Sequence, residues 1–298
     1  MKNSFTFILS LFFLFTATLK ASCVSEYKSV SYCIEYDTQK YKVIRSFKQN
    51  GQDKILVVDS DTLHTYIFDD QPFKKVKCSN SRYEQLLQSS SSFPYPLTND
   101  GITHFKYGLY LTVDFCPSSK CGYERGFFKS LIKNLPNPVP VTLFMTKRWI
   151  KRHKSAFCEL KRWANEGKLD ITWGNHTAYH FYKKGLPISQ NFVLCRHIHL
   201  KSDVLELEKY LIQNGVTPSV FFRFPGLVSN KKAVKEVSSL SLIMIGSDSW
   251  IAKCQQPKDG SIVLVHGNKN EHLGIYMFLQ YLHKYNHDEL FSLRNGVL

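Results

Sequence analysis

The fold is decided by the stretch Leu109-Tyr110-Leu111-Thr112-Val113-Asp114, an apolar run that ends on a carboxylate. Its length and its β-branched and aromatic residues are typical of a buried strand. Residues 126–135 then indicate a helix, and residues 141–145 indicate a second strand. A strand, a helix and another strand of this size form a unit in which the two strands lie parallel.

The same alternation continues to residue 285. We expect helices at 155–167, 203–215, 233–240 and 272–285, and strands at 169–172, 219–222, 242–245 and 262–265. Ser155 and Asp203 are the expected N-caps of the first two of these helices. Repeated units of this kind predict a mostly parallel sheet, either open or closed into a barrel, with chemistry at the strand ends.

Residues 22–86 follow a different, β-type alternation, with strands expected at 41–47, 55–59 and 63–68. Gln88 with the serine run at 89–92, and the prolines at positions 94 and 96, are typical of a linker. We therefore predict a small β-rich domain with its linker at 22–95 and a second domain at 96–298.

The first residues predict export. Lys2 precedes the apolar run Phe5–Leu19, and Ala21 offers a small residue for cleavage, so residues 1–21 resemble a secretory signal peptide. The run is short for a membrane span, and no second one follows, so the mature chain is expected in the periplasm or secreted. An uncleaved anchor and lipidation of Cys23 are the alternatives.

The amino-acid composition and the net charge exclude several classes of protein. Of the 298 residues, 43% are hydrophobic and 21% are charged, which excludes a disordered chain and a polytopic membrane protein. The net charge of +15 favours polyanionic partners, and a basic cluster is formed by Lys147, Arg148, Lys151, Arg152 and Lys154. This cluster is either a solvated helix face or an attraction for an anionic cell-envelope glycan; no motif indicates nucleic acid.

Eight cysteines in an exported chain are compatible with disulfide bonds. Cys116 and Cys121 are close enough for a local bridge, and Cys23, Cys33 and Cys78 fall together in the N-terminal part. The sequence leaves the pairing open.

Polar residues follow the strands expected in the second domain. They are Asp114, the pair His176 and His180, Arg223, Asp248 with Trp250, and His266. Each has an ordinary explanation when taken alone: a surface histidine pair, a structural ion pair between Asp114 and Arg223, a core histidine. The two histidines would share a face and hold one metal ion if their segment were helical.

Their order carries more information than any one of them. The chain reads Thr112-Val113-Asp114-Phe115-Cys116-Pro117-Ser118, then His176-Thr177-Ala178-Tyr179-His180, Arg223-Phe224-Pro225, Asp248-Ser249-Trp250 and Leu264-Val265-His266. Over residues 107–270 these five ordered motifs resemble the polysaccharide deacetylases of carbohydrate esterase family 4. Phe68-Asp69-Asp70-Gln71-Pro72 matches the first motif by letters, but it lies too far before His176, and we expect it to end a strand of the N-terminal domain.

The resemblance implies a distorted (β/α) barrel behind the small β-rich domain, and a divalent metal, zinc first, on His176, His180 and Asp114. It implies that Asp114 takes a proton from water, that Arg223 keeps Asp114 ionised, and that His266 protonates the leaving amine. Trp250, Asp248 and Pro225 are the expected substrate-binding residues, with Asp248 also expected to tune His266.

One position departs from the family pattern, since Phe115 stands where a metal-binding aspartate is expected. Three interpretations stay open: Asp114 completes the metal site, a ligand comes from elsewhere or from water, or the site is weak or dead. We therefore predict an exported de-N-acetylase of an N-acetylglucosamine polymer such as peptidoglycan, a chitin-like glycan or poly-N-acetylglucosamine. The alternatives are a non-catalytic glycan-binding protein on a degenerate barrel, and a different amide or ester hydrolase.

Overall fold

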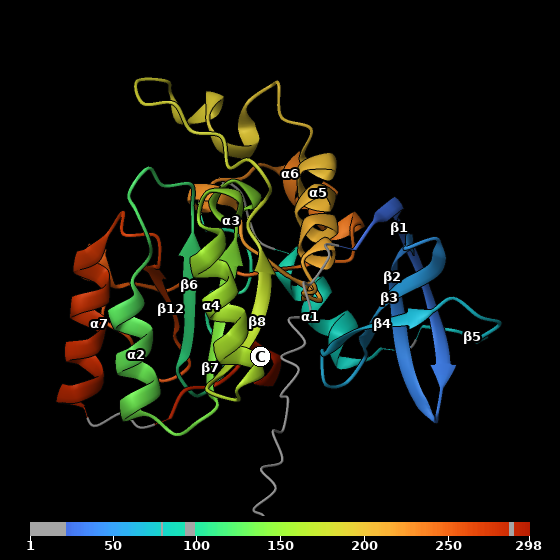
Figure 1. The fold of residues 1–298 in the computed structure, drawn as a ribbon, viewed down its shortest axis with the longest axis horizontal. Helices are drawn as coiled ribbons and strands as arrows, with labels where there is room; N and C mark the ends of the chain where they lie inside the picture. The colour runs from blue at the N-terminus through green and yellow to red at the C-terminus, as the bar shows by residue number, and fades with distance from the viewer. Residues whose placement is uncertain (1–21, 79, 93–98, 286–288) are drawn as a thin grey trace, which may run out of the picture.

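The computed structural model describes residues 22–78, 80–92, 99–285 and 289–298. The expected signal peptide and the expected domain boundary near residue 95 fall outside these ranges. The described residues form a five-stranded antiparallel sheet followed by a seven-stranded sheet with helices (Figure 1). None of the helices in the described ranges has the length and apolar character needed to cross a membrane.

The N-terminal sheet has the strand order β4-β3-β2-β1-β5. Its strands are β1 (Val24–Tyr36), β2 (Gln39–Gln49), β3 (Gln52–Asp59), β4 (Thr65–Asp69) and β5 (Lys74–Val76). Asp69 ends β4, as the sequence predicted.

Helix α1 (Arg82–Ser90) follows this sheet, so the linker expected from residue 88 begins at least three residues too early. Ser81 caps the helix by accepting a hydrogen bond from the backbone N–H of Glu84. Tyr83 and Leu86 are buried and fix one face of the helix, which outweighs the low helix propensity of the serine run.

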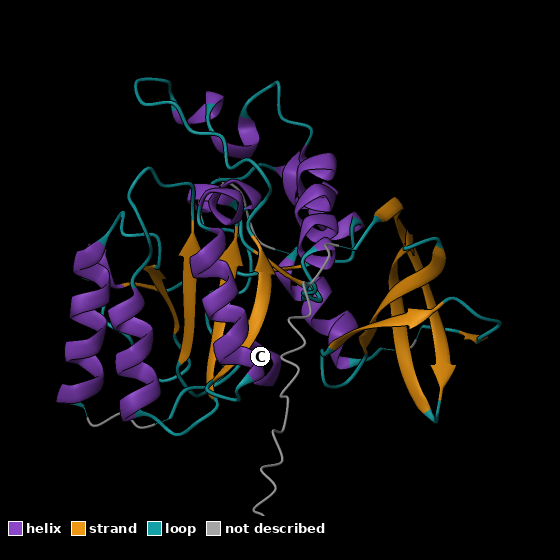
Figure 2. Cartoon of the chain, viewed as in Figure 1, coloured by secondary structure: helices purple, strands orange, loops and turns teal. Residues whose placement is uncertain are grey.

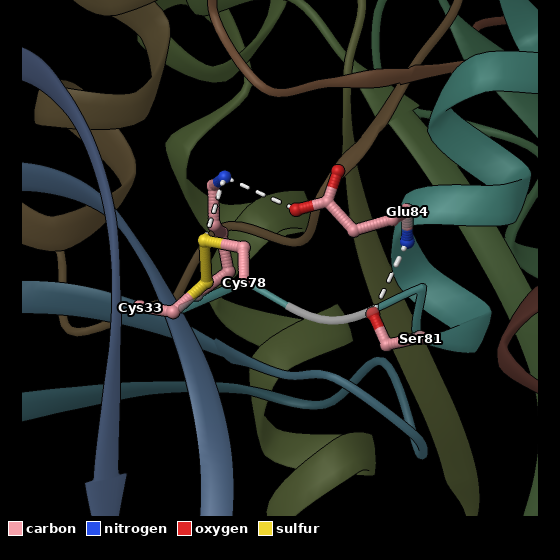
Figure 3. The surroundings of a disulfide bond; sticks show 5 residues. Cys33, Cys78, Ser81 and Glu84 are labelled. Carbon is pink, nitrogen blue, oxygen red and sulfur yellow. Dashed lines mark hydrogen bonds and ion pairs between the residues drawn. A yellow bond between two sulfur atoms is a disulfide. The ribbon is translucent and has the colours of Figure 1, made fainter. Parts of the chain in front are cut away.

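A disulfide bond joins Cys33 on β1 to Cys78, which lies 45 residues further along the chain. Figure 3 shows the bridge beside the first turn of α1, where Glu84 accepts a hydrogen bond from Lys42. Cys116 and Cys121, the expected local pair, are both free. The bridge closes a long loop around most of the N-terminal sheet.

Replacing both Cys33 and Cys78 with serine is expected to lower the free energy of unfolding by about 2–4 kcal/mol, because the unfolded chain regains the freedom of that loop. Urea denaturation measures the change. The matched control replaces the exposed free cysteines Cys23 and Cys254 with serine and should leave the midpoint in place. Equal midpoints for both double variants would contradict the prediction.

The second sheet has the strand order β10-β9-β8-β7-β6-β12-β11, and its neighbouring strands run parallel, as predicted. Its strands are β6 (Tyr110–Phe115), β7 (Val139–Met145), β8 (Leu169–Asn175), β9 (Phe221–Phe222), β10 (Ile243–Met244), β11 (Ser249–Trp250) and β12 (Ile262–His266). The sheet curls into a half barrel, which confirms the predicted fold class of an α/β barrel behind a β-rich domain.

Helices cover the outer face of the half barrel (Figure 2). They are α2 (Arg125–Asn134), α3 (Lys147–Arg152), α4 (Lys154–Asn165), α5 (Leu200–Gln213), α6 (Lys231–Ser239) and α7 (His272–Lys284). Short 3-10 turns lie at 188–190, 192–194, 225–227, 251–253 and 293–295. The main apolar core lies between this sheet and helices α2, α4 and α7.

Two expected N-caps are wrong. Ser155 lies inside α4, and Asp203 lies inside the first turn of α5. The cap positions are held by His153 and His199, neither of which caps through its side chain. Asp203 is buried and binds a neighbouring loop instead, as described below.

A buried ion pair joins the N-terminal sheet to helix α5 of the second domain. Arg45 on β2 donates from Nε and Nη2 to the carboxylate of Glu208 on α5, at 2.6 and 2.9 Å. Neither side chain is accessible to solvent, and Tyr27 donates a third hydrogen bond to Glu208. Arg45 also donates to the backbone carbonyl of Leu240, so one side chain holds two segments of the second domain.

Candidate active site

The site lies at the carboxyl ends of the parallel strands, where the arrows of β6, β7 and β8 end in Figure 1. Successive side chains of β6 point to opposite faces of the sheet. Phe115 faces the outer core, where its ring lies 4.3 Å from that of Trp149. Asp114 faces the opposite side, and its register partner on β12 is His266. The strand geometry alone therefore brings Asp114 and His266 together.

Asp114 and Arg223 form the ion pair that the sequence indicated. Arg223 Nη1 donates to Asp114 Oδ1 at 2.8 Å, and both side chains are buried. Arg223 also donates to Thr112 Oγ1 and to the carbonyl of Gly246, which fixes the plane of the guanidinium. Burial raises the pKa of Asp114, but the nearby Arg223, His176 and His266 outweigh it and keep the pKa below its usual value. Asp114 is therefore ionised at neutral pH.

His176 follows β8 directly, and its ring is oriented by the backbone. Its Nδ1 lies 2.8 Å from the backbone carbonyl of Arg223. A carbonyl oxygen only accepts, so Nδ1 carries a proton and Nε2 is the ring nitrogen that faces the site. That Nε2 lies 3.6 Å from Cys116 Sγ and 3.7 Å from Asp114 Oδ2.

His180 lies on a loop and not on a helix. Thr177 and His180 both have positive φ values, 67° and 47°. The Asp203 carboxylate accepts hydrogen bonds from the backbone N–H groups of Ala178 and Tyr179, which holds this loop in place. The two imidazole rings nevertheless lie 4.9 Å apart, as a metal pair requires. Among the residues that the structure describes, His180 Nε2 is buried without a hydrogen-bond partner.

Cys116 is one of two site residues that the sequence analysis missed. Its Sγ and one ring nitrogen each of His176 and His180 all lie within 4.8 Å of one another. Asp114 falls in a second such group with Cys116 and His266, and not in one with both His176 and His180. The alternation of side chains along an extended strand could have indicated Cys116, since residues 112, 114 and 116 point to one side of the sheet and residue 115 points to the other.

Burial raises the pKa of the Cys116 thiol, but the charge of His180 and hydrogen bonds with all three site histidines outweigh this and hold the pKa well below its usual range. Three imidazoles around one sulfur atom thus favour a thiolate over a thiol.

His266 is oriented by Glu271. His266 Nδ1 lies 2.8 Å from Glu271 Oε2, which also accepts a hydrogen bond from Trp250 Nε1. Burial lowers the pKa of His266, but contacts with Cys116, Glu271 and Asp114 raise it to about 10. His266 is therefore a cation at neutral pH and has a proton to give.

Asp248 does not contact His266. Its carboxylate lies 2.8 Å from His104 Nδ1 and accepts a hydrogen bond from the backbone of Ile262. The carboxylate beside His266 is that of Glu271, which sequence reasoning missed because it follows the last motif on the loop before α7.

A cavity of about 460 Å³ opens onto these groups. It is lined by Asp114, Cys116, Pro117, Arg148, His180, Tyr182, Phe192, Gly226, Leu227, Trp250, Leu264, His266, Asn270 and Glu271. Trp250 thus lines the cavity as expected, whereas Asp248 and Pro225 do not. Pro225 begins the 3-10 turn that places Gly226 in the lining. Arg148 brings the basic cluster of α3 to this cavity.

Residues 104–245 match the family model described as polysaccharide deacetylase. The chain is 20% identical to a family 4 carbohydrate esterase from Bacillus anthracis, with a TM-score of 0.45, covering 74% of this chain and 94% of the other. It is 19% identical to the family 4 carbohydrate esterase PdaA of Bacillus subtilis, with a TM-score of 0.47, covering 76% of this chain and 91% of the other. It is 14% identical to a family 4 pseudoenzyme from Bacillus anthracis, with a TM-score of 0.44, covering 74% of this chain and 73% of the other.

The second domain is an α/β half barrel with a polar site at the carboxyl ends of its strands. This domain of the chain belongs to the polysaccharide deacetylase family.

Proposed function

We propose that this protein is an exported, metal-dependent de-N-acetylase that hydrolyses acetamide groups of an N-acetylglucosamine polymer. One observation carries the proposal: an ionised carboxylate and a protonated imidazole face one cavity beside two histidine rings positioned for a metal. Amide hydrolysis needs a base for water and an acid for the departing nitrogen, and these groups supply both.

The donor set fits a divalent metal. His176 turns Nε2 toward the site, and within the described ranges His180 Nε2 is buried with no partner, which is costly unless another group binds there. A bound metal would polarise the acetyl carbonyl and lower the pKa of water. His176 and His180 would hold it; zinc is the first choice for imidazole ligands.

The remaining chemistry belongs to the protein's own side chains. Asp114 Oδ1 is held by Arg223, which leaves Oδ2, 3.7 Å from His176 Nε2, to take a proton from water. His266 lies beside Asp114 on β12, and its pairing with Glu271 leaves Nε2 to donate a proton to the leaving amine. Trp250 offers the ring face that sugars bind, beside His266 at 5.8 Å between centroids.

Export and an anionic glycan are further parts of the proposal. The Cys33–Cys78 bridge is typical of an oxidising compartment and agrees with the signal-like residues 1–21. Arg148 in the cavity lining supports attraction of an acidic polymer such as peptidoglycan. The competing hypothesis, a non-catalytic glycan-binding protein, arose because Phe115 stands where a metal-binding aspartate is expected. The side chain of Phe115 packs against Trp149 and points away from the site, so it does not block the cavity.

Acetate release tests the proposal. The purified protein is incubated with zinc and with chitin oligomers, peptidoglycan or poly-N-acetylglucosamine. Release from at least one polymer is expected. Binding to a polymer without acetate release would favour the non-catalytic alternative.

Replacing Glu271 with glutamine is expected to lower kcat about 10-fold, a fraction of the ~10²–10⁴ that a positioned acid contributes, with little change in KM. The amide cannot stabilise the charged imidazole, so His266 loses part of its proton at neutral pH. Steady-state kinetics measures both constants.

The matched control is Glu124→Gln. Glu124 pairs with His272 at 3.1 Å, the same kind of contact, but neither residue lines the cavity. An equal fall in kcat for both variants would show that the effect of Glu271→Gln is a general loss of structure.

A further inference from the structure

The position of the Cys116 side chain bears on how the metal is held. Cys116 follows Phe115 at the end of β6, where two hydrogen bonds pin the backbone. Thr146 Oγ1 donates to the carbonyl of Phe115 at 2.7 Å, and Asn268 Nδ2 donates to that of Cys116 at 2.8 Å. Hydrogen bonds to the carbonyls on both sides of the Cys116 Cα therefore fix the backbone that carries the sulfur atom.

The two histidines converge on that sulfur atom. His176 turns Nε2 toward it, 3.6 Å from Cys116 Sγ, while Nδ1 is bound to a backbone carbonyl. His180 is nine-tenths buried, and its Nε2 has no partner within the part of the chain that the structure describes. Cys116 Sγ and a nitrogen of each ring lie within 4.8 Å of one another, a spacing that three ligands of one ion have.

We propose that Cys116 is the third protein ligand of the metal, as a thiolate, so that the site is a cysteine with two histidines. The inference rests on the proposed function for the presence of a metal. It answers what replaces the carboxylate expected at position 115. It also leaves Asp114, already paired with Arg223, for proton transfer alone.

The donor set predicts which metal binds. A thiolate with two imidazoles suits zinc or cobalt(II), whereas magnesium, calcium and manganese prefer oxygen ligands. Coordination displaces the thiol proton to solvent, and a fourth position stays open as in catalytic zinc sites.

Cobalt(II) provides a readout independent of activity, because a thiolate bound to cobalt absorbs in the near ultraviolet. Cobalt(II) is titrated into the reduced, metal-free protein under anaerobic conditions. We expect a near-ultraviolet charge-transfer band that saturates at one equivalent. Cys116→Ser should abolish the band and weaken cobalt binding at least about 100-fold, the upper end of what loss of an outer partner of a ligand costs.

Two variants sharpen the test. Cys121→Ser, at an exposed free cysteine five residues further on, should keep the band and the affinity. Cys116→Asp should recover much of the lost affinity while the band stays absent, because a carboxylate binds the metal without sulfur charge transfer. A band that persists in Cys116→Ser, bound cobalt without a band in the wild type, or failure to bind cobalt would each overturn the inference.

Acetate release, measured on the same samples with zinc, separates the two proposals. A cysteine-dependent band without acetate release would sustain the ligand assignment and refute the deacetylase function. If acetate is released but Cys116→Ser binds metal as well as the wild type does, the deacetylase function would stand and the ligand assignment would be refuted.

Discussion

Replacing Asp114 with asparagine is expected to lower kcat for acetate release by a factor of about 10²–10⁴, the range that a positioned acid or base contributes. Asparagine keeps an oxygen that can accept the hydrogen bond from Arg223, but its side chain cannot take a proton. Because the wild-type carboxylate is ionised through Arg223, it is ready to accept that proton at neutral pH. Steady-state acetate release at saturating substrate measures the loss.

Asp248→Asn is the matched control for this variant. Asp248 is another carboxylate at a strand end of the same sheet, but it pairs with His104 and does not line the cavity. Its replacement should leave kcat close to that of the wild type. Thermal melting should show both variants folded, since Asp114→Asn leaves Arg223 with a weakened partner. Near-normal turnover in folded Asp114→Asn would remove Asp114 from the proton transfer.

Replacing Arg45 with alanine is expected to lower the free energy of unfolding by about 3–5 kcal/mol, because Glu208 would be left as an uncompensated buried charge. Arg45 and Glu208 are both inaccessible to solvent and join β2 to α5. The loss should therefore destabilise the attachment of the N-terminal sheet to the half barrel. Urea denaturation followed by circular dichroism measures it.

The control for Arg45→Ala is Lys48→Ala on the same strand. Lys48 pairs with Asp53 at 2.8 Å, but both side chains are substantially exposed. Loss of a surface pair costs about 0–1 kcal/mol, so the unfolding midpoint should hardly move. Similar midpoints for the two variants would mean that the buried pair does not hold the domains together.

Periodicity predicted most of the second domain because its strands are short apolar runs separated by amphipathic helices. Strands β6, β7, β8 and β12 lie where the pattern indicated them. The serine run up to residue 92 led to the wrong prediction that a linker starts at residue 88. Its first residues belong to helix α1, which Tyr83 and Leu86 bury on one face. Local propensity carries no information on such tertiary contacts.

Site residues that lie at strand ends could be predicted from the sequence. Site residues that loops bring into place were harder to predict. Asp114 and His266 meet because β6 and β12 are neighbours, and Arg223 reaches Asp114 from the end of β9, with β7 and β8 between, because the sheet is curled. The pair of His176 and His180 meets for another reason: the loop is shaped by positive φ values and by Asp203. Glu271 was missed because its role depends on a loop after the last strand, which no periodic pattern describes.

Acetate release before and after metal removal shows whether hydrolysis depends on a metal held by His176 and His180. The purified protein is treated with a chelator, dialysed, and assayed on N-acetylglucosamine oligomers with and without added zinc. We expect no release by the stripped protein and full recovery with zinc, but no recovery in His180→Ala. Undiminished release by protein shown to be free of metal would contradict this expectation.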